Sequence, residues 1–152
     1  MLSPLEIEAL SLSLKVSLWA VAWSLIPGIA IAWLLARREF PGKALLDGLV
    51  HLPLVLPPVA LGYVLLVLFG RNGPLGAWLH DWFGVNLVFS WRGAALAAAV
   101  MAFPLLVRAI RLSMEAVDQR LETAARTLGA RPVRVFLTIT LPLTSPGILT
   151  GV

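Results

Sequence analysis

Few side chains in this sequence have the types and spacing that chemistry requires. Asp47 and His51 lie four residues apart, so on a helix they would stand one turn apart and could relay a proton. Their position beside the boundary of an apolar run favours a simpler interpretation, a capping pair at a membrane interface. A proton-coupled carrier would need more ionisable groups deeper in its apolar runs, and we find none there.

Other arrangements that carry catalysis are missing from the sequence. There is no Gly-x4-Gly-Lys-Ser/Thr loop to hold phosphate, and no Ser/His/Asp or paired-carboxylate set that a span could organise. The chain has no cysteine and two histidines, which leaves no credible metal site. We therefore predict no catalytic residue, no metal, no cofactor and no enzymatic activity in this chain.

A polar stretch between two apolar runs carries the most informative pattern. Asp118 is suited to cap a helix that continues to Leu128, where a carboxylate near the positive helix end is favourable. Gly129 supplies the left-handed conformation that ends a helix, and Pro132 is suited to the first turn of a second one. The pattern predicts a helix-turn-helix inside a loop at residues 113–140.

One face of the first of these helices is shallow and built partly from small side chains. The residues that share this face, at i, i+3, i+4 and i+7, are Leu121, Ala124, Ala125 and Leu128. Glu122 and Arg126 can pair at i, i+4 on its flank. Alanines let a groove of another protein approach closely, so the face favours a docking helix over a helix lying on lipid or a solvated loop.

Composition places the rest of the chain in a membrane. With 59% hydrophobic residues, 13% charged residues and a mean hydropathy of +0.90, a chain of 152 residues cannot bury its apolar surface in one small soluble core. Apolar runs long enough to cross a bilayer as helices occupy residues 16–36, 45–69 and 91–110, and a fourth begins at 141–152. The fold class that follows is all-α, a polytopic helical membrane protein with a single domain over 1–152.

The fourth run is short. Only ten residues extend from Leu143 to Val152, about half a crossing at 1.5 Å per residue. The sequence therefore predicts a C-terminally truncated piece of a longer subunit. At the other end, the segment before the first run lacks the basic region of a signal peptide, which predicts a retained span.

Positive charges indicate the orientation of the chain. The net charge of +4 is distributed over short loops between apolar runs, which favours lipid headgroups and topology over nucleic acid. Three Lys and Arg residues fall in 37–43 and six in 108–134, whereas 70–90 holds only Arg71. Basic loops resist translocation, so we predict an N-terminus outside and both basic loops, with the docking helix, in the cytoplasm.

Prolines interrupt each of the three complete runs. They are Pro27 in the first, Pro53, Pro57 and Pro58 in the second, and Pro104 in the third. Each removes a backbone donor, and in lipid such breaks are tolerated where neighbouring helices recover the freed carbonyls. The pattern favours a multi-helix transporter, although ordinary kinking of membrane helices would produce it too.

The predicted outer loop, residues 71–84, starts with turn residues and then reads as a short interfacial helix. Trp78 and Trp82 recur at helical spacing and are typical of an aromatic belt at the membrane surface. Arg71, Asn72 and Asp81 are the candidate residues in this loop for docking an external binding protein.

The polar stretch resembles the cytoplasmic coupling loop of bacterial ABC importer permeases. The consensus of that family reads Glu-Ala-Ala-x3-Gly-x9-Ile-x-Leu-Pro, and Ala124-Ala125, Gly129 and Ile139-Thr-Leu-Pro142 are in register with it. Thr123 stands where the consensus has glutamate, and Glu122 stands one position earlier. The resemblance implies that this helix docks in a groove of a cytoplasmic ATPase subunit, with Glu122, Ala124, Ala125 and Gly129 as its coupling residues.

Further segments are similar to the molybdate permeases of that family. They include residues 38–43, 46–58, 69–76, 89–93 and 103–108. The resemblance implies a homodimer of permeases in the bacterial inner membrane, two ATPase subunits, and a periplasmic or tethered protein that captures molybdate. Sulfate, thiosulfate or tungstate permeases are the alternative, and an inactive permease fragment or a membrane scaffold without transport activity is the second.

Overall fold

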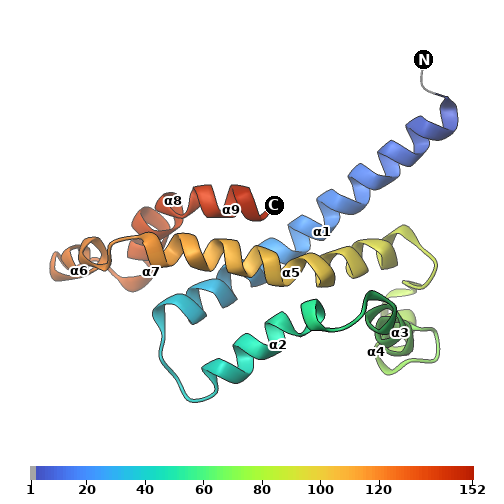
Figure 1. Ribbon diagram of the computed structural model, residues 1–152, viewed down its shortest axis with the longest axis horizontal. Coiled ribbons are helices and arrows are strands. Elements are labelled where there is room, and N and C mark those ends of the chain that lie inside the picture. The colour runs from blue at the N-terminus through green and yellow to red at the C-terminus, as the bar shows by residue number, and fades with distance from the viewer. Residues whose placement is uncertain (1–2) are drawn as a thin grey trace. The chain divides into compact units, whose positions relative to one another are not determined.

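A computed structural model describes residues 3–152, and these residues form helices and no strand (Figure 1). This confirms the predicted all-α class. Two of the helices are long and apolar enough to cross a membrane, α1 (Pro4–Arg37) and α5 (Trp91–Ala116). Pro27 lies inside α1 and Pro104 inside α5, and neither ends its helix.

The first helix is longer than the apolar run that predicted it. It has 34 residues and begins at Pro4, before the expected start at 16. At 1.5 Å per residue it is about 51 Å long, well beyond the roughly 30 Å of a hydrocarbon core. Its first turn is held at the N-terminus by Ser3, whose backbone amide donates to the carboxylate of Glu6 at 2.6 Å.

The run at 45–69 is not one straight helix. It consists of α2 (Lys43–Val55) and α3 (Pro58–Phe69), and their axes are bent by 111° at the break between them. Pro57 and Pro58 have no backbone N–H, and Pro57 is extended, with ψ of 140°. Because consecutive prolines cannot continue the hydrogen-bond ladder, this pair breaks the run where Pro27 and Pro104 do not break theirs.

The predicted short helix of the 71–84 loop is present as α4 (Pro74–Phe83). Gly84 ends it with φ of +62°. The ring centroids of Trp78 and Trp82 are 6.3 Å apart, so the two indoles lie on one side of the helix. α4 packs closely on the end of α3, because a side chain at Gly76 would meet the carbonyl oxygens of Phe69 and Gly70.

Short helices make up the C-terminal part of the chain. In order they are α6 (Gln119–Thr127), α7 (Pro132–Val135), the π-helix η1 (Phe136–Thr140), α8 (Leu141–Leu143) and α9 (Ser145–Gly151). The segments Pro132–Leu143 and Ser145–Gly151 form a second bent pair, at 62°. The run expected to begin a fourth span is therefore helical, with a bend at Thr144.

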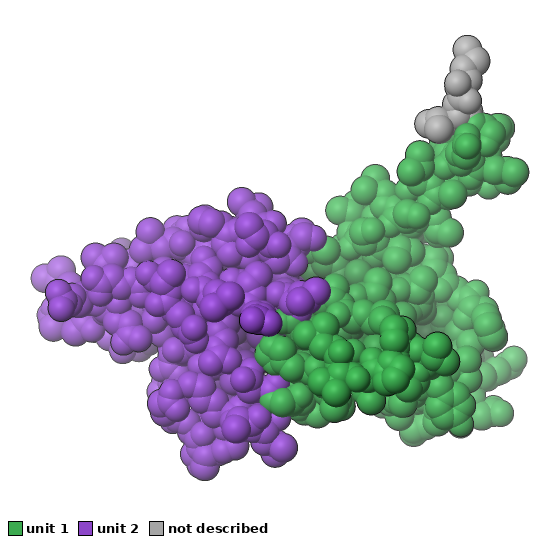
Figure 2. Space-filling view, viewed as in Figure 1, with its two compact units in different colours: residues 1–24, 48–104 green, residues 25–47, 105–152 purple. Residues whose placement is uncertain are grey.

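The chain divides into two compact units, coloured in Figure 2. Unit 1 extends to Ser24 and includes Gly48–Pro104, and unit 2 comprises Leu25–Asp47 and Leu105–Val152. The best buried side chains of unit 2 come from three segments of the chain. Among them are Leu35, Val107, Ile110, Met114 and Val135. This core supports the polar helix-turn-helix, and the residues of α6 and of the contacts around Glu122 described next belong to unit 2.

Candidate functional site

Helix α6 has well-formed ends, which fix its position in the loop. The Asp118 side chain caps it, since an Asp118 carboxylate oxygen accepts from the Arg120 amide at 2.9 Å. At the other end, Gly129 has φ of +85°. The Gly129 amide donates to the Arg126 carbonyl, and the Ala130 amide donates to the Ala125 carbonyl, the bond pattern of a Schellman motif. The predicted cap and the predicted glycine stop are both confirmed.

The face that the sequence predicts for docking is open to the surroundings. Leu128 is 88% exposed and Leu121 is 50% exposed. Ala124 and Gly129 are also exposed, and Ala125 is half-buried. Within residues 3–152, no segment covers this small-residue face completely. The polar helix therefore exposes an apolar surface near its end.

Exposed arginines lie on the same helix-turn-helix as this face. They are Arg120 and Arg126 on α6, and Arg131 and Arg134 at the second helix. A surface that combines exposed leucines with guanidinium groups fits an apolar groove with acidic residues at its rim. It also fits a position beside anionic lipid on the cytoplasmic side of a membrane.

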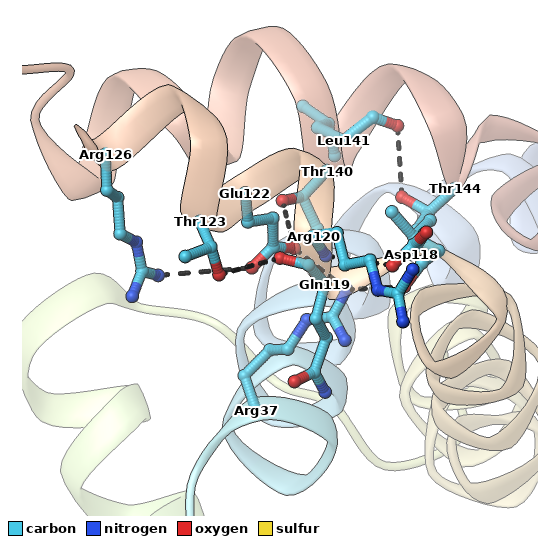
Figure 3. A network of polar contacts seen from close by, with 11 residues as sticks. Arg37, Asp118, Gln119, Arg120, Glu122, Thr123, Arg126, Thr140, Leu141 and Thr144 are labelled. Carbon is cyan, nitrogen blue, oxygen red and sulfur yellow. Dashed lines mark hydrogen bonds and ion pairs between the residues drawn. The ribbon is translucent and has the colours of Figure 1, made fainter. Parts of the chain in front are cut away.

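Glu122 differs from the other predicted coupling residues because its side chain is buried. Only 8% of it is exposed, and one carboxylate oxygen accepts from Arg37 Nη2 and from Thr140 Oγ1, both at 2.8 Å (Figure 3). The predicted partner Arg126 lies farther away, with its Nη2 4.0 Å from the second carboxylate oxygen. Glu122 thus contacts its own chain and is not part of the open face.

The sequence did not point to the two partners of Glu122. Arg37 ends α1 and belongs to the basic loop 37–43, whose charges indicate only the orientation of the chain, while Thr140 ends η1 in the middle of an apolar segment. Helical spacing predicts a pair with Arg126, which the structure has at 4.0 Å, but it gives no indication of Arg37 or Thr140. A contact across 85 positions of sequence has no local pattern.

Comparison with known proteins identifies the family. Residues 28–152 match the family described as binding-protein-dependent transport system inner membrane component. The chain belongs to this family. With the two long apolar helices, this makes it part of a multi-pass inner-membrane protein and a non-catalytic membrane component of a transport system.

Individual relatives of this inner membrane component are similar over almost all of the chain. It is 66% identical to the molybdenum transport system permease protein ModB of Escherichia coli K12, over 96% of this chain and 64% of that protein. It is 59% identical to the protein of the same name in Haemophilus influenzae, over 97% of this chain and 64% of that protein. The sulfate transport system permease protein CysW of Synechocystis is 36% identical, over 95% of this chain and 52% of that protein.

The chain thus spans somewhat under two thirds of the length of the molybdenum permeases that it matches. The matched part contains α6 and the residues that hold it, since the family match begins at 28 and includes Arg37 and Thr140.

The three candidate residues for external docking in this permease component lie in unit 1. Arg71, Asn72 and Asp81 are all exposed. Arg71 lines an open groove of about 350 Å³ together with Asn86 and the apolar residues that follow it. Asp81 has its neighbour as a partner, with His80 Nδ1 3.7 Å from its carboxylate. The structure brings these residues to the surface but does not gather them into one site.

Asp47, which the sequence pairs with His51 at a membrane interface, also bonds to a second helix. Arg111 of α5 donates to the Asp47 carboxylate at 3.2 Å and to the Glu115 carboxylate at 2.8 Å. Asp47 therefore takes part in an ion pair that links α2 to α5 within unit 2. Among residues 3–152 no group of three or more His, Asp or Glu side chains could hold a metal ion.

Proposed function

We propose that this chain is part of the permease subunit of an ATP-driven importer that carries molybdate across the bacterial inner membrane, and that α6 is its coupling helix. The observation that carries the proposal is the exposed small-residue face of α6 in a chain of this family. Gly129 makes the turn that ends this helix. We infer the cargo from the relatives named for molybdenum transport, which are 66% and 59% identical to this chain.

Docking would use the small residues of α6. Ala124, Ala125 and Gly129 let a groove of a cytoplasmic ATPase subunit approach the helix backbone, and the leucines beside them would fill apolar parts of that groove. The surrounding arginines would face acidic groups of the ATPase. ATP hydrolysis takes place in that separate subunit, and closure of the nucleotide domains pulls on α6.

The assembly that we propose has two copies of the permease, two ATPase subunits and an external binding protein. The distribution of Lys and Arg supports an orientation with the helix-turn-helix in the cytoplasm and the N-terminus outside. In this orientation α4 lies on the outer side, where Arg71, Asn72 and Asp81 are available to the binding protein. The headgroup layer would hold the aromatic side chains of α4, which are Trp78, Trp82 and Phe83.

Sulfate and tungstate permeases remain the alternative within this mechanism. Only the cargo would change, and α6 would couple the permease to an ATPase subunit in the same way. The difference between 66% and 36% identity favours molybdate over sulfate.

Uptake in cells tests the proposal. A strain that lacks its own molybdate permease would express the gene for this chain in its full reading frame, together with the ATPase and binding-protein genes, and receive radiolabelled molybdate. We expect uptake that depends on ATP and falls when unlabelled molybdate is added, but not when sulfate is added. Uptake of labelled sulfate without uptake of molybdate would assign the alternative cargo, and no uptake of either would reject the importer.

A further inference from the structure

We propose that Glu122 is a positioning residue that transmits movement of α6 to two other elements, the end of α1 through Arg37 and the end of η1 through Thr140. We call these three side chains the Glu122 clamp. The inference rests on the proposed function, since it requires that α6 receives the movement of an ATPase subunit. It assigns to Glu122 a role inside the permease instead of a contact with the partner.

The geometry of the clamp connects three segments that are distant in sequence. One Glu122 carboxylate oxygen accepts from Arg37 and from Thr140, each at 2.8 Å, and the same Arg37 nitrogen lies 3.4 Å from the Val117 carbonyl just before α6 (Figure 3). The three side chains are almost completely buried. Any displacement of α6 must therefore either carry its two neighbours along or break buried charge-assisted bonds.

Stability alone is a poor explanation for this arrangement. Arg37 is 7% exposed, and its Nε and Nη1 are buried without a hydrogen-bond partner in the described structure. A buried donor without a partner is unfavourable, and a buried ion pair is often no more stable than well-packed apolar side chains. Such pairs are better explained where they specify a position or a switch, which is the use that we assign to this one.

The unsatisfied donors also allow a second arrangement of the pair. Arg37 uses only Nη2 to reach Glu122, whereas a guanidinium can bind a carboxylate with two parallel bonds. A small rotation of α6 could replace the single bond with a two-bond pair, using a nitrogen that is now free. The clamp therefore has a plausible second state without needing new residues.

The third member of the clamp ends the π-helix. In a π-helix each turn contains an extra residue, which rotates the following residues relative to an ordinary helix, and such turns are frequent at functional sites. Thr140 is 1% exposed and directs its hydroxyl to Glu122, whereas Thr138, two positions earlier, is exposed and donates to the Arg134 carbonyl of its own segment. Through Thr140, movement of α6 reaches α8 and α9.

The Thr140 and Thr138 pair gives a sharp test. Thr140→Val keeps the shape of the side chain and removes only the hydroxyl, and Thr138→Val does the same at the matched exposed position. We would purify the full-length permease with its ATPase subunits, reconstitute the complex in liposomes with the binding protein, and measure molybdate transported per ATP hydrolysed. We expect Thr140→Val to lower this ratio at least about fivefold and Thr138→Val to leave it unchanged.

The charged pair provides a second, independent arm. A single Glu122→Gln substitution would leave Arg37 buried without a countercharge and could prevent folding. The double variant R37Q/E122Q removes both charges and retains groups that can hydrogen-bond to each other. We expect it to assemble with the ATPase and to transport less molybdate per ATP.

The outcomes separate the clamp from the importer and from simple stability. If Thr140→Val and R37Q/E122Q assemble and keep the parental ratio, the clamp is rejected and the proposed function stands. If the amount of molybdate transported per ATP falls only in proportion to losses in melting temperature and in ATPase capture, the three residues have a structural role. The clamp is then likewise rejected. If the parent protein captures no ATPase and transports nothing, both proposals fail together.

Discussion

At the residue scale, the turn after α6 depends on one backbone conformation. Gly129 has φ of +85°, and no atom lies near the position that a Cβ would take, so the cost of a side chain there comes from the backbone alone. For an ordinary L-residue the left-handed region costs about 1 kcal/mol, and asparagine tolerates it better than alanine.

We therefore predict that Gly129→Ala weakens capture of the ATPase subunit more than Gly129→Asn does. The alanine variant should also lower the free energy of unfolding by about 1 kcal/mol, because the Schellman bonds at the end of α6 would be strained. Pull-down of the purified ATPase by the full-length permease measures the first effect, and thermal unfolding in detergent measures the second. If Ala is tolerated as well as Asn, the turn does not limit docking.

A buried carboxylate shows where residue-level prediction stops. The position of Glu122 in α6 could be predicted from the sequence, but its burial could not. Burial depends on Arg37 and Thr140, which come from other helices and approach only when the chain folds. Periodicity within α6 offers Arg126 as the partner, and that side chain is mostly exposed to solvent.

At the element scale, local rules accounted for several helix ends. Asp118, Gly129 and Pro132 mark boundaries that the structure has, because caps and stops depend on a few neighbouring residues. The break between α2 and α3 follows from two consecutive prolines. The π-helix η1 did not follow from its sequence, since Phe-Leu-Thr-Ile-Thr has no signature that distinguishes a π-turn from an α-turn.

Packing between α9 and α5 depends on a glycine. A Cβ at Gly147 would meet the Ser113 side chain and lie 2.9 Å from the Ala109 carbonyl oxygen, both in α5. We predict that Gly147→Ala lowers the free energy of unfolding by about 2 kcal/mol, because the helices cannot separate without losing buried contacts.

Gly62→Ala is the matched control for this substitution. Gly62 lies inside α3, and nothing is within 4 Å of the position of its Cβ. The control should be neutral or slightly stabilising, since alanine is the better helix former by up to about 1 kcal/mol. Thermal unfolding of both variants in detergent makes the comparison, and equal melting temperatures would show that the α9–α5 contact is not tight.

At the scale of the whole molecule, charge distribution and the coupling helix must agree on one orientation. The proposed function requires the basic loops 37–43 and 108–134 on the side of the ATPase and the 70–90 loop on the other. The two arguments are independent, because one counts charges near the apolar runs and the other depends on the small-residue face of α6. A topology experiment therefore tests both at once.

Residues 1–152 contain no cysteine, so a thiol introduced there is the only one in this part of the chain. Asn72→Cys and Thr127→Cys each place one thiol at an exposed, uncharged position, the first before α4 and the second at the end of α6. In intact spheroplasts expressing the chain in its full reading frame, a membrane-impermeant maleimide should label position 72 at once and position 127 only after the membrane is permeabilised. Because neither substitution changes the Lys and Arg count of a loop, it should leave the orientation as the charges set it. The reverse labelling pattern would place α6 outside, where no ATPase could reach it, and would remove the basis for the coupling proposal.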